Sequence, residues 1–92
     1  MGIAVRNRSL ESIYVFVTTW NNKGRDEWFE IKPGESETWD RTASWEFVAI
    51  KNKEDTKRTG VYLECNKSRE VTFDYFPPNN TSPFGLNVYP RE

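Results

Sequence analysis

The residues best suited to recognise a ligand are four tryptophans, all within residues 20–45 of this 92-residue chain. An indole ring offers a flat apolar face that can stack on a sugar ring, and an N–H group that donates a hydrogen bond. Sugar recognition also needs planar side chains that donate and accept hydrogen bonds. Two short runs combine these features and form the candidate ligand-binding site: Trp20, Asn21 and Asn22, then Trp39, Asp40 and Arg41.

Part of the aromatic content must belong to the protein core, because small β-sandwiches commonly bury one or two tryptophans. We assign Trp28 and Trp45 to packing. Trp20 and Trp39 stand beside turns and polar residues, so they are the two tryptophans that we expect at the surface.

Catalytic chemistry has little support in this chain. It contains no histidine, which removes the commonest general base and metal ligand. Cys65 is the single cysteine, so neither an intrachain disulfide nor a cysteine zinc site can form. It shares a predicted strand face with Val61 and Leu63, which indicates a small buried hydrophobic residue. We therefore expect a non-enzymatic protein with no catalytic residues, no metal and no cofactor.

The overall charge excludes a further class of partner. The net charge is −1 and the isoelectric point is about 5.5, so no basic field attracts a nucleic-acid backbone, and we expect no nucleic-acid partner. The first residues lack the charged start and long apolar run of a signal peptide. We expect a cytoplasmic protein, or one released without a signal peptide.

The elements that must position these residues are β-strands. Apolar and polar residues alternate with period two, and turn residues recur about every 8 to 12 positions, as in a β-sandwich or barrel. We predict one domain over residues 1–92, an all-β antiparallel sandwich or flattened barrel of about seven strands. The predicted strands cover residues 3–5, 13–20, 28–31, 36–39, 45–51, 61–65, 70–76 and 86–89.

Three of these segments carry specific expectations. Residues 13–20 are apolar on both faces at their start, which predicts a central strand covered on both sides. Pro33 and Gly34 predict a tight turn, because proline fixes φ and glycine accepts a left-handed conformation. Residues 61–65 and 70–76 are predicted to form a hairpin.

Residues 77–83 contain three prolines in seven positions, which is incompatible with regular ladder pairing. Proline pre-organises such a loop. This segment supports an alternative function, that of a protein-interaction or inhibitor module which uses the loop as a rigid insert.

Residues 3–9 (IAVRNRS), 13–17 (IYVFV) and 31–36 (IKPGES) resemble the opening of aegerolysin-type proteins. These are small, acidic β-sandwich proteins without a signal peptide, best known from fungi, that bind membrane lipids. Fungal lectins built on related sandwiches begin in a similar way. The resemblance covers about residues 3–41 and implies a β-sandwich, with membrane-lipid binding as an alternative function.

Taken together, these features predict a lectin-like carbohydrate-binding module whose partner is a glycan or glycoconjugate. A single shallow sugar site binds weakly, so useful avidity needs several copies. We therefore expect a homo-oligomer.

Overall fold

The computed structural model describes residues 2–19, 27–41, 45–65, 67–76 and 85–90. These residues form eight β-strands and no helix. The strands are β1 (Ile3–Asn7), β2 (Ile13–Val17), β3 (Phe29–Ile31), β4 (Ser36–Trp39), β5 (Trp45–Lys51), β6 (Arg58–Glu64), β7 (Arg69–Phe73) and β8 (Leu86–Pro90).

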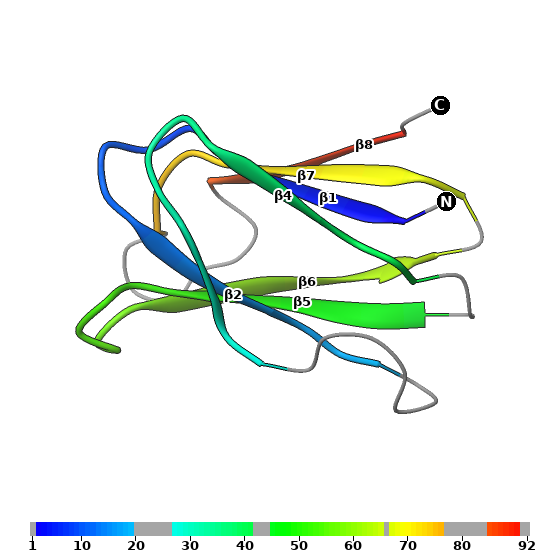
Figure 1. Cartoon of the computed structure of the whole chain (residues 1–92), viewed down its shortest axis with the longest axis horizontal. Helices are drawn as coiled ribbons and strands as arrows, with labels where there is room; N and C mark the ends of the chain where they lie inside the picture. Colours follow the sequence, from blue (N-terminus) through cyan, green and yellow to red (C-terminus); the bar gives the residue numbers. More distant parts are fainter. Residues whose placement is uncertain (1, 20–26, 42–44, 66, 77–84, 91–92) are drawn as a thin grey trace.

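The strands are arranged in two four-stranded sheets that face each other, as Figure 1 shows. Sheet A has the order β4-β1-β7-β8 and sheet B the order β3-β2-β5-β6. The predicted all-β sandwich of about seven strands is therefore confirmed, and each of the eight segments predicted as strands overlaps one of the eight strands of the described residues.

Alternation along each strand explains why the sheets pack face to face. In β2, Ile13, Val15 and Val17 are fully buried, while Tyr14 and Phe16 are half-buried on the other face. The strand lies between β3 and β5, so its predicted central position is confirmed. The expectation that both of its faces are covered is wrong, because Tyr14 and Phe16 are only half-buried on the face directed away from sheet A. A period-two pattern points every second side chain into the space between the sheets, where burial stabilises the fold.

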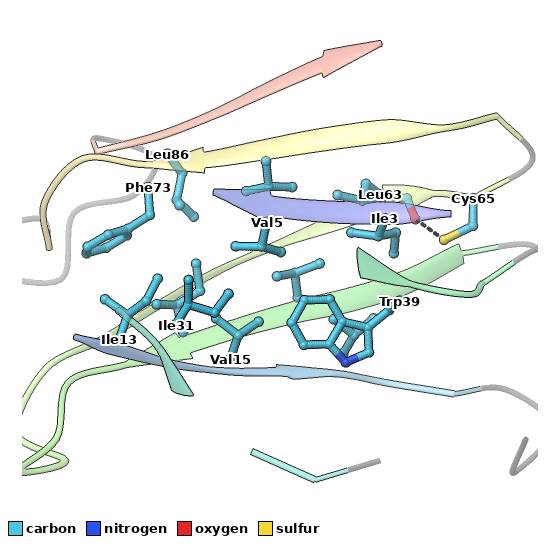
Figure 2. Close-up of a cluster of buried hydrophobic side chains, with 14 residues drawn as sticks. Ile3, Val5, Ile13, Val15, Ile31, Trp39, Leu63, Cys65, Phe73 and Leu86 are labelled. Carbon is cyan, nitrogen blue, oxygen red and sulfur yellow. Dashed lines mark hydrogen bonds between the residues drawn. The ribbon is translucent and has the colours of Figure 1, made fainter. Parts of the chain in front are cut away.

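The core consists of the side chains that both sheets direct inward (Figure 2). Each buried valine, leucine or isoleucine contributes about 1.5–3 kcal/mol relative to an exposed one. Cys65 is fully buried beside Leu63, as the sequence predicted. The buried cluster contains Ile3, Val5, Ile13, Val15, Val17, Ile31, Trp39, Val48, Ile50, Leu63, Cys65, Val71, Phe73 and Leu86.

The turn at Pro33 and Gly34 is also as predicted. Gly34 has a φ of +82°, in the left-handed region that glycine adopts without a steric penalty. The amide of Glu35 donates to the carbonyl of Lys32 at 3.0 Å and closes the turn.

The predicted hairpin of residues 61–65 and 70–76 is wrong. β6 pairs with β5 in sheet B, whereas β7 pairs with β1 and β8 in sheet A, so the chain crosses from one sheet to the other between them. Consecutive strands are neighbours only about two-thirds of the time, and here each of them has a better partner elsewhere.

The pairing of β1 with β7 is parallel, with Ile3 opposite Arg69 and Asn7 opposite Phe73. The other strand pairs are antiparallel. The expectation of an antiparallel sandwich therefore holds for every described pair except this one, which lies at the centre of sheet A.

Candidate functional site

The predicted ligand-binding residues do not form one exposed cluster. Trp20, Asn21 and Asn22 lie outside the described residues. Trp39 is only 1% exposed, and Figure 2 shows its ring among the inward-facing side chains of the sandwich. The prediction that Trp39 is a surface stacking platform is therefore wrong.

The register of β4 explains the burial of Trp39. This residue lies opposite Ile3, which is itself fully buried, whereas Ser36 and Thr38 of the same strand are exposed. Its ring packs edge-on against Phe29 at a centroid distance of 6.2 Å. The polar residues that follow Trp39 in the sequence belong to the end of the strand and indicate nothing about the direction of its side chain.

Arg41 is also buried, and its guanidinium is directed at the backbone. Nε donates to the carbonyl of Thr18 at 2.8 Å, Nη2 to that of Val17 at 3.1 Å and Nη1 to that of Asp40 at 2.9 Å. These bonds join the end of β4 to the end of β2. Arg41 is thus a structural brace and not a ligand-binding residue, whereas Asp40 is exposed.

A second buried charge lies at the same end of the core, and the sequence analysis missed it. Glu46 shares the inward face of β5 with Val48, and its Oε1 accepts a hydrogen bond from the Thr18 hydroxyl at 2.6 Å. That hydroxyl accepts from the amide of Phe47 at 2.8 Å. The alternation of β5 was the signal that could have identified Glu46 as buried.

This environment also determines the chemistry of Cys65. Burial raises the pKa of its thiol, and the neighbouring carboxylate of Glu46 raises it further. Because the thiolate is the reactive form of cysteine, the side chain is held in its inert state.

The outer face of sheet B carries a continuous set of aromatic rings, which we call the aromatic face. Its two most exposed rings are Tyr62 at 61% and Trp45 at 44%. The two tryptophans assigned to packing, Trp28 and Trp45, are thus both exposed, opposite to the prediction. The aromatic face consists of Tyr14, Phe16, Trp28, Trp45, Phe47 and Tyr62.

Trp45 and Tyr62 stack on each other at one end of the aromatic face. Their ring centroids are 5.3 Å apart and the planes are inclined by 25°. The contact is diagonal, because Trp45 lies opposite Glu64 and Tyr62 lies opposite Phe47 in the ladder. The half-buried Glu64 therefore places a carboxylate beside the exposed indole.

Phe47 occupies the middle of the aromatic face, and Gly60 makes room for it. A Cβ atom at Gly60 would lie 2.5 Å from Cζ of Phe47, so the ring rests against the glycine backbone. Ala49 is the ladder partner of Gly60. The absence of a side chain at Gly60 thus lets the Phe47 ring lie against the sheet at the middle of the aromatic face.

Trp28 is engaged by cations of the protein itself. The Lys51 Nζ lies 4.4 Å from its ring centroid and the Arg58 guanidinium lies 5.9 Å away, within the range of cation–π attraction. Arg58 also forms two hydrogen bonds to Asp55, at 2.8 and 2.9 Å, which lower the pKa of that carboxyl. Trp45 and Tyr62 have no such cations among the described contacts.

The outer face of sheet A is polar by comparison. Tyr89 is its single aromatic side chain in the described strands, and it stands among charged and hydroxyl residues. These residues are Arg6, Ser36, Thr38, Glu70, Thr72 and Asn87. The two outer faces therefore differ in kind, one aromatic and the other polar, although each belongs to a four-stranded sheet.

A third feature is the loop between β1 and β2, which presents Leu10 with 99% of its surface exposed. The buried Asn7 braces this loop. Its Nδ2 donates to the carbonyls of Glu11 and Ile31, at 2.7 and 2.9 Å, and its Oδ1 accepts from the amide and hydroxyl of Ser9. The hydrogen bonds of Asn7 thus fix the loop in a conformation that keeps Leu10 exposed.

Beside Leu10 lies a hollow of about 330 Å³. Its charges have both signs, and the Arg8 Nε is 3.5 Å from a carboxylate oxygen of Asp74. Phe73 and Phe76, whose centroids are 4.7 Å apart, form its apolar part. The predicted strand 70–76 ends at Phe73 in the structure. Beyond the strand, Tyr75 is exposed, whereas the partly buried Phe76 packs against the core.

Comparisons with known proteins identify no relative: no family model, no curated protein and no solved structure matches this chain. The resemblance to aegerolysins rests on the sequence segments alone. No group of three or more acidic or cysteine side chains in the described ranges is arranged to hold a metal ion. The described part of the chain also has no helix that could cross a membrane.

Proposed function

We propose that this protein is a non-enzymatic carbohydrate-binding module and that its binding surface is the aromatic face. The observation that carries the proposal is the exposed stacked pair of Trp45 and Tyr62. The proposal keeps the ligand class expected from the sequence and moves the site to the outer face of sheet B.

Rings of this kind suit sugars for a physical reason. The C–H faces of a pyranose are apolar and bind an aromatic face, while its hydroxyls need polar partners at the perimeter. Glu64 lies beside Trp45, and Lys51 and Arg58 lie at the opposite end of the same surface. A chain of two or three sugar rings that crosses Phe47 would contact both ends.

The proposal is tested by a glycan array probed with the labelled protein, followed by titration of the best hit. We expect Trp45→Ala and Tyr62→Ala each to weaken binding about tenfold, which corresponds to about 1.4 kcal/mol, within the range of an aromatic contact. Tyr89→Ala is the matched control, because it removes a similarly exposed ring from sheet A, and it should bind as the wild type does. Unimpaired binding by both Trp45→Ala and Tyr62→Ala would contradict the proposal.

A membrane-lipid ligand is the second candidate, and Leu10 is the observation that favours it. A fully exposed leucine beside Tyr75 and the cation of Arg8 could enter the acyl boundary of a bilayer. One leucine contributes only about 1.5–3 kcal/mol on burial, so this contact alone is weak. Liposome flotation that Leu10→Asp abolishes, together with a blank glycan array, would move the protein to this class.

The protein-interaction alternative depends on residues 77–83, which lie outside the described residues. It remains a prediction of the sequence.

A further inference from the structure

The sandwich has four edge strands, and they differ in how they are protected. An edge strand exposes unpaired backbone groups, and proteins shield it by shortness, charge or proline. β3 has only three residues, β4 carries Glu37, and β6 begins with Arg58 and ends with Glu64. β8, with the sequence LNVYP, contains no charged residue.

The backbone groups that β8 directs outward follow from its register. The amide of Asp74 donates to the carbonyl of Gly85 at 2.7 Å, and Phe73 lies opposite Leu86. Along an antiparallel strand, the backbone N–H and C=O groups of successive residues point alternately toward one neighbouring strand and toward the opposite side. Asn87 and Tyr89 therefore face β7, whereas the N–H and C=O groups of Leu86 and Val88 face away from it.

Pro90 fits this alternation. Its nitrogen falls at a position that faces the free edge, so the missing N–H removes no hydrogen bond from the β7 ladder. Its carbonyl remains available on the outward side.

Two apolar side chains of β8, Val88 and Tyr89, are also exposed to an unusual degree. Val88 is on the inward side of sheet A, opposite the buried Val71, yet 41% of it is exposed. Tyr89 on the outer side is 46% exposed. Both faces of the strand thus have apolar surface beside the free edge.

We propose that β8 pairs with β8 of a second copy of this chain, antiparallel and centred on Val88. Val88 then lies opposite its counterpart, and the two residues exchange N–H to C=O hydrogen bonds. Leu86 lies opposite Pro90 of the other copy, and its N–H donates to the proline carbonyl. Two bonds at the centre and one at each end join the sheets into one continuous sheet.

A second copy fits this edge better than an unrelated peptide does, because the pairing is self-complementary. In a two-fold contact only the residue on the axis meets its own equivalent, and residues close to the axis lie near theirs, so charged residues there would repel their own copies. β8 has none. The proline lies opposite Leu86, where its carbonyl accepts from the Leu86 N–H; it has no N–H for the Leu86 carbonyl, so each end of the contact forms one hydrogen bond.

The test is sedimentation velocity with the full chain at concentrations up to about 1 mM, where even a weak contact is occupied. We expect a concentration-dependent dimer for the wild type. Val88→Pro removes the two central donors without touching the β7 ladder and should raise the dimer dissociation constant at least tenfold. Val88→Thr keeps the N–H and the side-chain shape and should dimerise like the wild type.

Several results would overturn the proposal. They are a monomeric wild type over the whole concentration range, dimerisation of folded Val88→Pro equal to that of the wild type, and a monomer that binds an extended peptide at this edge. If Val88→Pro does not fold, Val88→Lys decides the matter, because it places like charges across the axis and leaves the backbone intact. Its dimer should be lost at low salt, and an unchanged dimer would contradict the pairing.

Discussion

At the scale of single residues, buried polar side chains determine the shape of the sandwich ends. Asn7, Arg41 and Glu46 are all almost fully buried, and each has a backbone or side-chain partner. A buried polar group is tolerated only when its hydrogen bonds are satisfied. These three residues therefore act as fixed points between strand ends.

Asn7→Ala should destabilise the protein by about 2–3 kcal/mol, because it removes the Nδ2 donor from the buried carbonyl of Ile31 and from the carbonyl of Glu11, and leaves the Ser9 amide without its acceptor. Urea unfolding measures this difference. Asn87→Ala is the control, since Asn87 is exposed and makes one 3.3 Å bond to Asp74, and it should change stability by less than about 0.5 kcal/mol. Similar losses for both variants would argue against the bracing role of Asn7.

Cys65 predicts a dependence of stability on pH. Its pKa is raised in the folded state, so above about pH 8.5 the unfolded chain loses a proton that the folded chain keeps. The stabilisation is complete below the unfolded pKa and declines as the pH rises toward the folded pKa. The unfolding free energy should therefore decrease more between pH 7 and pH 10 for the wild type than for Cys65→Ala. Equal decreases would disprove the assignment.

The tryptophans show which part of the site could be predicted from the sequence. Their number indicated a surface rich in aromatic rings, and that surface exists. Polar neighbours were used to select the exposed ones, and for Trp39, Trp28 and Trp45 this criterion gave the wrong answer. Side chains alternate between the two faces of a strand, so a tryptophan is exposed or buried according to its position in that alternation. To use the alternation, one must know which face of the strand is covered by the other sheet.

At the scale of elements, local pattern identifies strands well and their partners poorly. Residues 45–51 are a strand with the predicted bounds, and the turn at Gly34 has the predicted geometry. The pairing of β7 with β1 could not be predicted, because no local feature distinguishes a hairpin from a crossing between sheets. A strand pairs where it can both hydrogen-bond to the free edge of a sheet and place its apolar face in the core.

Gly34 and Gly85, two glycines with positive φ in the described residues, allow a matched test of turn geometry. A Cβ at Gly85, whose φ is +88°, would overlap the carbonyl oxygen of Tyr75, whereas a Cβ at Gly34 would meet nothing within 4 Å. Gly34→Ala should therefore cost only about 1 kcal/mol of conformational strain. Gly85→Ala should lose at least about 2 kcal/mol more in chemical denaturation, since it must displace the backbone that leads into β8.

At the scale of the whole molecule, the difference between the two outer faces connects the two proposals. Extending sheet A through β8 places the two-fold axis perpendicular to that sheet. The two copies of sheet B then lie on one side, and both aromatic faces point in the same direction. Two weak sugar sites facing one glycan surface would gain avidity without any new contact.

The parallel pair at the centre of sheet A has a consequence for how the chain becomes folded. Ile3 and Arg69 lie more than sixty residues apart in the sequence, yet they are neighbours in the ladder. Figure 1 shows β1 beside β7 in sheet A. During synthesis β1 cannot pair with β7 until β7 emerges from the ribosome. Before that, β4 can pair only with a β1 strand that has no neighbour on its other edge. Such distant pairing places the protein among the slow two-state folders, with times of about milliseconds to seconds. Until then the inward Ile3 and Val5 of β1 remain available to chaperones and to other nascent chains.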